Sequence, residues 1–314
     1  MIAHLGCGYW GKNIVSTLHK HNLLGGIYDF DPRLNSDFCR KYSLHERTIN
    51  ELLDDPCIFA CSVATPANSH YELSKLILNA GKHLFVEKPI CLSLQEANHL
   101  KEIANDHSLK IMVGHLMHYH AGFMKMKEIL NSLQLGKVKR IKSYRKSYGI
   151  LRDDEDVIWS FAPHDISMAF AITSSFNFNN LSVSRKKFFN NNTDSANIFF
   201  TSNSIPVEID LDWSSSYKQQ RFEVYCEDGI VILDDTLEND KKLAIIKTKF
   251  NQSCLRAKNI LQQDYIHCDY SLLPLEAELL KFNEISITDS SDCYNNVNEA
   301  IAVLSVLKKV EFYD

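Results

Sequence analysis

The first 120 residues alternate short apolar runs with stretches in which apolar residues recur at helical spacing. The apolar runs are Ile2–Leu5, Leu24–Tyr28, Ile58–Val63, His83–Val86 and Lys110–Val113, and the helical stretches are Asn13–His21, Asp31–Tyr42, Asn68–Asn79 and Ser93–His107. Each run has the length of a buried strand, and each helical stretch is long enough to cross back over a sheet. This alternation predicts βαβ units, and hence a parallel sheet with helices on both faces.

The pattern changes in the second half of the chain, where strand-like segments follow one another without intervening helices. They are Val138–Arg145, Ser182–Phe189, Asn197–Ser202, Val207–Trp213, Phe222–Cys226, Gly229–Leu233 and Leu243–Lys247. Helices are expected at Met124–Leu133, Val157–Ile172, Leu275–Asn283 and Val297–Phe312, and a loop at Thr173–Asn180. A run of strands of this kind predicts a mostly antiparallel sheet. We therefore predict an α/β domain over residues 1–120 and an α+β domain over residues 121–314.

Composition narrows the class of protein. A chain of 314 residues suits two domains, and 45% apolar with 23% charged residues is typical of globular proteins. No apolar run approaches the ~20 residues of a membrane span, and the first residues show no export signal. Nine scattered cysteines without a C-x-x-C pair favour a reduced, cytoplasmic protein, and a net charge of −5 argues against nucleic-acid binding.

Three glycines follow the first predicted strand in the order G-x-G-x-x-G: Gly6, Gly8 and Gly11. The pattern alone is a weak signal, but its place between a strand and a helix is the context that a dinucleotide-binding turn requires. The first glycine permits the tight turn, the second lets the backbone approach the pyrophosphate, and the third lets helix and strand pack closely. Tyr9 and Trp10 lie between them, so their backbone amides are expected near the pyrophosphate.

Asp29 ends the second predicted strand, about 20 residues beyond the glycine turn, where an acid binds the ribose hydroxyls of a dinucleotide. A carboxylate at this place repels a 2′-phosphate, which favours NAD over NADP. The alternative is a surface aspartate at a strand end, and the nearby Arg33 offers a partial counter-charge for a phosphate.

Further stretches then carry a resemblance to a known family: ATPANSH (Ala64–His70), GKHLFVEKP (Gly81–Pro89), APHD (Ala162–Asp165), VGHLMHYH (Val113–His120), SSSYKQQR (Ser214–Arg221) and PLEAE (Pro274–Glu278). With GCGYWG they resemble the glucose–fructose oxidoreductase / inositol dehydrogenase family, known as Gfo/Idh/MocA. EKP at the end of a strand is the most specific of them. The resemblance implies a Rossmann domain, then a large, open-faced, mostly antiparallel sheet with helices on one face, and NAD as the cofactor.

Within this family, YRKSYGILRDDEDVIWSFAPHDIS (Tyr144–Ser167) looks most like a subgroup that acts on nucleotide-linked sugars. The UDP-N-acetylglucosaminuronate 3-dehydrogenases of surface-polysaccharide pathways are examples. The resemblance implies oxidation of the sugar C3 hydroxyl to a ketone.

Lys88 ends a strand at the carboxyl edge of the predicted sheet, where ligands of α/β proteins bind. A lysine there can hydrogen-bond a sugar hydroxyl and stabilise the alkoxide that forms as hydride leaves. Desolvation and the cofactor charge can lower its pKa enough for proton transfer. Taken alone it would be a solvated lysine before a turn proline, but its place in EKP implies a catalytic role.

His164 is the expected partner of Lys88, because histidine titrates near neutral pH and can take the hydroxyl proton. The alternative is a histidine at a helix start that is satisfied by the backbone. Many family members carry Asp four residues earlier, where this chain has Ser160, so a Lys–Asp–His triad is in doubt. We predict a Lys88/His164 dyad, with Ser160 at most a hydrogen-bonding helper and Asp165 a structural neighbour.

The resemblance also implies further contacts on each side of the reaction. Expected cofactor contacts beyond the glycine turn and Asp29 are Thr65, Pro66, His70, Glu87 and Lys88, while the rings of Tyr9 and Trp10 either pack on the cofactor or cap the helix. Expected substrate contacts are His115, Tyr119, Arg145, Tyr148, Arg152, Ser160 and His164. The arginines suit a carboxylate or a diphosphate, because a guanidinium offers two parallel donors. Lys218 and Arg221 are weaker candidates.

Three closely spaced histidines could suggest a metal-binding cluster: His115, His118 and His120. No Cys or carboxylate lies close in sequence to complete the ligand set, so we expect polar residues of a cleft and no metal.

Two alternatives to a nucleotide-sugar dehydrogenase remain open from the sequence. One is a free-polyol dehydrogenase or an oxidoreductase that recycles tightly bound NAD. The other, favoured only by Ser160, is a non-catalytic NAD-binding regulator of the same fold. The partner expected in each case is a small molecule, with no nucleic acid and no membrane. An open, apolar sheet face would favour self-association, so we predict a homodimer or homotetramer through the C-terminal sheet.

Overall fold

The computed structural model describes residues 1–148, 155–189, 192–247, 263–288 and 296–312. The chain divides into two compact units. The first comprises Met1–Leu116 and Leu273–Ser305, and the second Met117–Leu272 with Val306–Asp314. A single division at residue 120 therefore differs from the observed one, because the chain returns to the first unit through helix α8 (Pro274–Ile287) and part of α9 (Val297–Glu311).

The first unit is built on a parallel sheet of five strands in the order β2-β1-β3-β4-β5. The strands are β1 (Ile2–Leu5), β2 (Leu24–Tyr28), β3 (Ala60–Val63), β4 (His83–Val86) and β5 (Ile111–Val113). The order reverses between β1 and β3, and ligands of such sheets bind at the carboxyl ends of the strands beside this point. The expected parallel α/β domain is confirmed.

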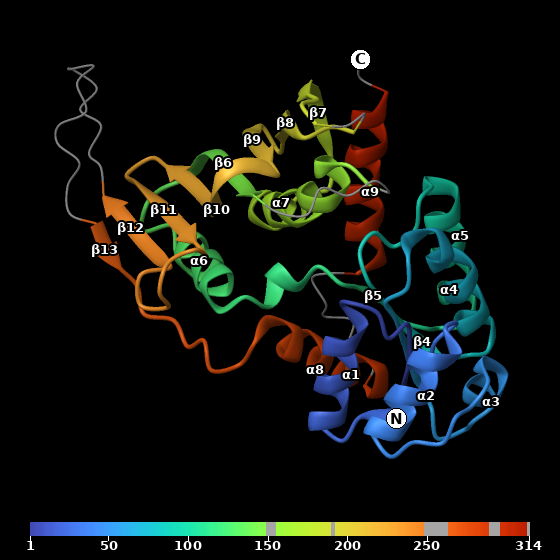
Figure 1. The fold of residues 1–314 in the computed structure, drawn as a ribbon. Helices are drawn as coiled ribbons and strands as arrows, with labels where there is room; N and C mark the ends of the chain where they lie inside the picture. The colour runs from blue at the N-terminus through green and yellow to red at the C-terminus, as the bar shows by residue number, and fades with distance from the viewer. Residues whose placement is uncertain (149–154, 190–191, 248–262, 289–295, 313–314) are drawn as a thin grey trace, which may run out of the picture. The chain divides into compact units, whose positions relative to one another are not determined.

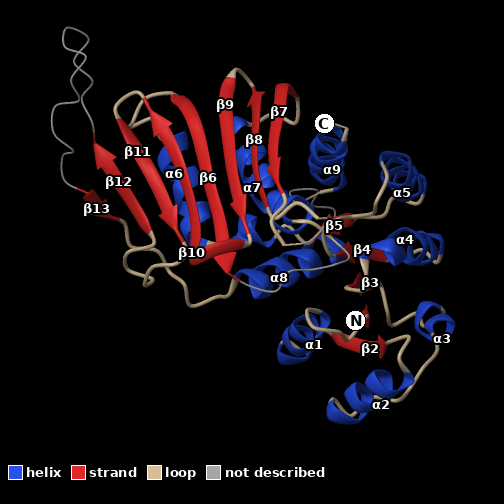
Figure 2. Cartoon of the chain, turned by 45° about the horizontal axis from the view of Figure 1, so that its top comes forward, coloured by secondary structure: helices blue, strands red, loops and turns tan. Residues whose placement is uncertain are grey.

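Helices cover both faces of this sheet, with α1 (Gly11–Lys20) and α8 on one side and α4 (His70–Asn79) and α5 (Leu94–Asp106) on the other (Figure 2). The α1 helix buries Ile14, Val15 and Leu18, the apolar positions that predicted it. Two hydrogen bonds fix α8 to the carboxyl end of α1, where the Glu276 carboxylate accepts from Lys20 and His21 at 2.7 and 2.6 Å. This long-range return could not be predicted from local sequence patterns.

The other helices of the unit are α2 (Pro32–Lys41), the short α3 (Ile49–Leu53) and the 3-10 turn η1 (Ala67–Ser69). Sequence reasoning missed α3. Its signal is a capping box, in which Thr48 accepts from the Glu51 backbone N–H while the Glu51 carboxylate accepts from the Thr48 backbone N–H.

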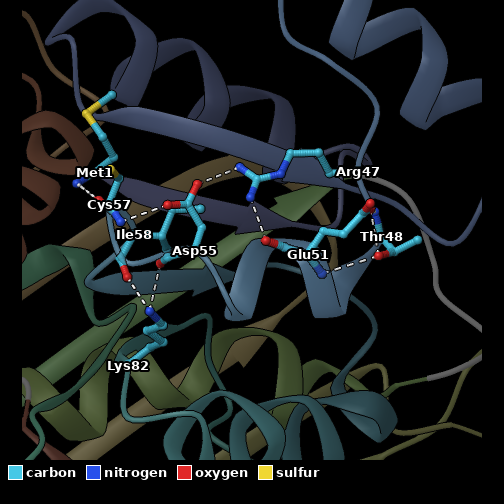
Figure 3. Close-up of polar contacts among 8 residues, drawn as sticks. All are labelled: Met1, Arg47, Thr48, Glu51, Asp55, Cys57, Ile58 and Lys82. Carbon is cyan, nitrogen blue, oxygen red and sulfur yellow. Dashed lines mark hydrogen bonds and ion pairs between the residues drawn. The ribbon is translucent and has the colours of Figure 1, made fainter.

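A polar network ties the chain together just before β3 and β4 begin (Figure 3). The Lys82 ammonium donates to the carbonyls of Asp55 and Ile58 at 2.9 and 2.7 Å. The Asp55 carboxylate pairs with Arg47 at 2.9 Å, and Arg47 also donates to the Glu51 carbonyl. This network lies at the amino end of the parallel strands, so its residues stabilise the sheet from the end opposite to the expected ligand site.

The second unit holds an eight-stranded sheet in the order β13-β12-β11-β10-β6-β9-β8-β7. Its strands are β6 (Val138–Tyr148), β7 (Phe178–Lys186), β8 (Ser195–Ser202), β9 (Ile205–Asp212), β10 (Ser214–Cys226), β11 (Gly229–Asp234), β12 (Leu243–Lys247) and β13 (Gln263–Tyr265). Among the described residues every pair is antiparallel except β6 with β9. Figure 2 shows α6 (Ala121–Asn131) and α7 (Val157–Thr173) against one face. The fold class expected for this half is confirmed.

Two details of this unit differ from the expectation. The loop predicted over Thr173–Asn180 is shorter, because α7 ends at Ser174 in a left-handed conformation with φ of 51° and β7 begins at Phe178. The sheet face opposite α6 and α7 was expected to be apolar, but at its centre it carries ion pairs between β6 and β9. Glu208 pairs with Arg140 and Lys142, and Asp210 pairs with Lys146.

Figure 1 follows the chain from β1 to the end of α9. Every helix within the described ranges is too short or too polar to cross a lipid bilayer.

Candidate functional site

The glycine turn leaves β1 and enters α1 at the carboxyl edge of the parallel sheet. Gly6 has a φ of +97°, and a Cβ there would lie 2.7 Å from the Ala64 carbonyl oxygen. A Cβ on Gly11 would lie 1.7 Å from the Gly6 carbonyl oxygen, so only glycine fits where helix and strand meet. Around Gly8 nothing lies within 4 Å of such an atom. The turn is thus tight on its inner side and open at its second glycine, as a pyrophosphate site requires.

Asp29 follows β2 and lies against this turn. Its carboxylate accepts a hydrogen bond from the Cys7 backbone N–H at 2.5 Å and another from the Asp31 backbone N–H at 2.8 Å. The acid is therefore held beside the turn, with lone pairs left to accept ribose hydroxyls. The Arg33 side chain is 90% exposed, and its Nε lies 3.5 Å from the carboxylate of Asp31 rather than beside Asp29.

Trp10 reaches across from the start of α1 to the end of β4. Its indole N–H donates to the Glu87 carboxylate at 2.5 Å, while the other Glu87 oxygen accepts from the Lys88 backbone N–H at 3.2 Å. Burial raises the pKa of Glu87 to about 7, and the hydrogen bond from Trp10 opposes that rise. Tyr9 is instead 80% exposed, with the Lys12 ammonium 5.0 Å from its ring centroid.

Lys88 follows β4 at the same edge of the sheet and is partly buried. The peptide bond from Lys88 to Pro89 is cis. The residue thus lies where the sequence predicted it, one position beyond Glu87 and on the edge that carries the glycine turn and Asp29.

His70 is buried and joins the loops that follow β3 and β4. Its Nε2 lies 2.8 Å from the Thr65 carbonyl oxygen, and its Nδ1 lies 2.8 Å from the Pro89 carbonyl oxygen. Burial lowers the pKa of His70, and a neutral ring can donate to only one of these carbonyls at a time. Thr65 bonds the Ser69 hydroxyl at 2.7 Å, and Pro66 precedes the η1 turn. Both His70 nitrogens face the backbone, so its contribution is to hold these loops.

In the second unit, α7 carries the predicted acid/base residue. The Asp156 carboxylate caps the helix and accepts from the backbone N–H groups of Ile158 and Trp159, each at 3.0 Å. Ser160 and His164 are four residues apart, which places both on one side of α7, and both are partly buried.

Arg145 was expected to bind a substrate anion, but two of its donors are taken by α7. They bond the two oxygens of the Asp165 carboxylate at 2.7 and 3.0 Å, and the Ser143 hydroxyl donates to the same carboxylate at 2.7 Å. The Arg145 side chain is 13% exposed and that of Asp165 is 1% exposed. The pair therefore holds α7 to β6, and Asp165 is the structural partner that its position suggested.

The remaining predicted substrate residues belong to several elements of the two units. His115, in the first unit, is buried; Tyr119, in the turn η2 (Leu116–Tyr119), is partly buried; and Tyr148, at the end of β6, is 78% exposed. Arg152 falls outside the described residues. The weaker candidates are placed on β10, where Lys218 is exposed and Arg221 pairs with Glu223 at 2.5 Å.

Two of the three histidines after β5 have separate hydrogen-bond partners. His118 bonds the Ser167 hydroxyl at 2.7 Å, and His120 bonds the Asp235 carboxylate at 3.1 Å. Within the described part of the chain, no three His, Cys, Asp or Glu side chains are grouped so that they could hold a metal ion.

The carboxyl edge of the first unit's sheet brings together four groups: the glycine turn, Asp29, Glu87 and Lys88. The open glycine turn suits a pyrophosphate, Asp29 suits a ribose diol, and Glu87 and Lys88 supply groups that accept or donate protons.

The chain is similar to known oxidoreductases. Residues 1–115 match the model of the GFO_IDH_MocA family, an oxidoreductase family with an NAD-binding Rossmann fold. The scyllo-inositol 2-dehydrogenase (NADP(+)) IolW of Bacillus subtilis is 29% identical over 123 residues, 39% of this chain and 33% of the relative. The UDP-N-acetylglucosamine 3-dehydrogenase of Acidithiobacillus ferrooxidans is 23% identical over 175 residues, 54% of this chain and 53% of the relative. In sequence, the chain spans about a third of the first relative and about half of the second.

The fold likeness extends further than the sequence likeness. The structure of the Acidithiobacillus ferrooxidans enzyme superposes with a TM-score of 0.85 at 18% identity, covering 98% of this chain and 95% of that one. GenD2 from gentamicin A biosynthesis, solved in complex with NAD, superposes with a TM-score of 0.81 at 17% identity, covering 99% of this chain and 92% of that one. The same two-part fold therefore runs through nearly the whole chain.

Proposed function

We propose that the chain belongs to the Gfo/Idh/MocA family of NAD-binding oxidoreductases, whose model its residues 1–115 match, and that it is an NAD-dependent sugar dehydrogenase. The observation that carries the proposal is the common edge at which the glycine turn, Asp29 and Lys88 end their strands. We propose NAD rather than NADP because the Asp29 carboxylate is held beside the turn by Cys7 and would repel a 2′-phosphate.

The proposed substrate is a nucleotide-linked sugar that is oxidised at C3. Support comes from the relative named UDP-N-acetylglucosamine 3-dehydrogenase, whose fold matches nearly the whole chain, and from the resemblance of Tyr144–Ser167 to enzymes of this kind. The second candidate is a free polyol of the inositol kind, which the similarity to a scyllo-inositol 2-dehydrogenase favours. That relative is named for NADP, so the choice of cofactor needs its own test.

In the proposed reaction the C–H bond of the carbinol carbon breaks, and its hydrogen leaves as a hydride while the hydroxyl proton goes to the protein. Bound NAD supplies the hydride acceptor. Lys88 hydrogen-bonds the reacting oxygen and stabilises the charge that develops there. We assign the proton to His164 on the family resemblance, with Lys88 as the second member of the dyad. Asp165, held by Arg145, fixes the helix from which His164 projects.

The assignment is tested by screening nucleotide sugars and inositols for thermal stabilisation with added NAD, and then by turnover of any hit. Lys88→Ala should lower kcat by at least about a hundredfold, the contribution expected of an acid/base group, while NADH still binds. Lys101→Ala, on α5, is the matched control and should turn over normally. If Lys88→Ala turned over an identified substrate at the normal rate, the assigned chemistry would be wrong. A protein that binds dinucleotide but transfers no hydride would favour the non-catalytic regulator that Ser160 leaves open.

We further propose a cytoplasmic homo-oligomer that binds neither nucleic acid nor membrane. The nine cysteines are scattered along the chain without a C-x-x-C pair, which supports a reducing compartment. The net charge of −5 gives no basic surface excess for nucleic acid.

A further inference from the structure

His4 is a polar residue in the middle of a strand that is otherwise apolar and wholly buried. The other residues of β1 are Ile2, Ala3 and Leu5, and the imidazole of His4 is 0% exposed. A buried polar ring is costly unless both nitrogens have partners. Both do: Nδ1 lies 2.8 Å from the Ser62 hydroxyl on β3, and Nε2 lies 2.8 Å from the Gly6 carbonyl oxygen.

These partners determine the direction of each hydrogen bond. A carbonyl oxygen can only accept, so Nε2 carries the hydrogen and donates to Gly6. Nδ1 then accepts from the hydroxyl of Ser62, whose alternative acceptor, the Ala3 carbonyl, lies 3.4 Å away. A neutral ring with one donor and one acceptor satisfies both contacts. Burial lowers the pKa of His4 to about 4, which keeps the ring neutral at physiological pH.

The Gly6 carbonyl belongs to the same peptide group as the Cys7 N–H, and that N–H donates to Asp29 at 2.5 Å. A peptide group is planar, so a bond that fixes its carbonyl also fixes the direction of its N–H. The contacts therefore form one continuous series, from Ser62 through His4 and the Gly6–Cys7 peptide to the Asp29 carboxylate. Its first member is on β3 and its last is at the end of β2.

We propose that His4 is a positioning residue for cofactor selection, which sets Asp29 through the Gly6–Cys7 peptide without touching the dinucleotide. The inference rests on the proposed NAD site. A hydrogen-bond donor in β1 thus determines how firmly the ribose-binding carboxylate is held, and with it the preference for a free 2′-hydroxyl over a 2′-phosphate. An aliphatic residue would fill the same space but offer the Gly6 carbonyl no hydrogen-bond donor.

The test is direct titration of the full chain with NADH and NADPH, read by the fluorescence of the reduced nicotinamide. His4→Leu should weaken NADH binding roughly tenfold, the effect expected when a hydrogen bond to a charged group is disturbed. Binding of NADPH, to which Asp29 contributes no attraction, should change less than about twofold. The Kd for NADPH divided by the Kd for NADH should therefore fall. A general loss of stability would not change this ratio.

Three further variants separate positioning from packing. His4→Gln retains an amide donor for the Gly6 carbonyl and should bind with a ratio close to that of the unaltered chain. His83→Leu removes a histidine that accepts from the Lys110 backbone N–H, and it should leave the ratio unchanged. In an Asp29→Ala background, His4→Leu should have no further effect on the ratio, because the residue through which it acts is gone.

The outcomes distinguish this inference from the proposed function. If His4→Leu lowers Tm but leaves the Kd ratio unchanged, or if its effect persists without Asp29, His4 is a packing residue and the inference is overturned. If His4→Leu does not fold, the ratio in His4→Phe decides in the same way, since phenylalanine keeps a ring in this space but offers the Gly6 carbonyl no donor. If the unaltered chain binds neither dinucleotide, the proposed function itself fails.

Discussion

At the scale of single residues, the groups that end the strands of the first unit are held by residues from other elements: the Cys7 backbone N–H bonds Asp29, and the Trp10 indole bonds Glu87. Gly6, Asp29 and Lys88 were predicted because each follows a recognisable strand at a characteristic spacing. The hydrogen bond from Trp10 to Glu87 joins residues 77 positions apart, and no periodic pattern in the sequence predicts it. The same holds for His4, which local sequence would place in an apolar strand without a function.

Glu87 gives a prediction about pH. Its pKa is raised from 4.5 to about 7 in the folded chain, so the native state binds this proton more tightly than the unfolded state does. The stabilisation by protonated Glu87 is thus fully present below pH 4.5 and is lost as the pH rises through about 7. Relative to Glu87→Gln, which cannot titrate, the free energy of unfolding of the unaltered chain should fall over this interval and then level off.

Urea unfolding at a series of pH values measures the free energy of unfolding of the unaltered chain and of Glu87→Gln. The pH dependence that arises from His4 and other groups is common to both chains, so it cancels in the difference. The fluorescence of Trp10, isolated by comparison with Trp10→Phe, should report the same ionisation because its indole N–H bonds the titrating carboxyl. Parallel stability curves for the two chains would show that Glu87 does not titrate in this interval.

At the scale of elements, the strands and helices were largely predictable because apolar spacing records which face of each is buried. The observed α7, at Val157–Thr173, begins where the pattern placed it. What could not be predicted is how elements are fixed to one another. Arg145 on β6 looked like an anion-binding residue, since sequence cannot show that Asp165 already occupies two of its donors.

The Arg145–Asp165 pair gives a prediction about stability. Asp165→Asn leaves a guanidinium that is 13% exposed without its charged partner, which should cost roughly 3–5 kcal/mol in the free energy of unfolding. The control is Lys142→Ala, which removes an ion pair to Glu208 on the open sheet face and should cost less than about 1 kcal/mol. Urea denaturation measures both. Equal costs for the two variants would mean that the pair does not anchor α7.

At the scale of the whole molecule, the two-part organisation was visible in the change from alternating to consecutive strands, but the return of the chain was not. Residues 273–305 rejoin the first unit, where Phe282 of α8 packs on Phe85 with ring centroids 5.7 Å apart. The apolar positions of α8 predict a helix, and they do not say which sheet it covers.

The open sheet face gives a prediction about assembly. We expect light scattering at micromolar concentration to find a dimer or tetramer, and the charged centre of the face makes that assembly sensitive to salt. Arg140→Glu should weaken it by placing like charges beside Glu208, whereas Lys101→Glu on α5 should leave it unchanged. A monomer at every salt concentration would exclude self-association through this face.

The measurement that bears most directly on the proposed chemistry follows the hydride itself. A UDP-linked N-acetylated sugar carrying deuterium at C3 is incubated with the protein and NAD, and the reduced cofactor is analysed by mass spectrometry. We expect NADH that carries the deuterium, together with a 3-keto sugar, and neither product with Lys88→Ala. Reduced cofactor without deuterium would contradict oxidation at C3. If neither this sugar nor an inositol reduced the bound cofactor, the chain would not be the sugar dehydrogenase proposed here.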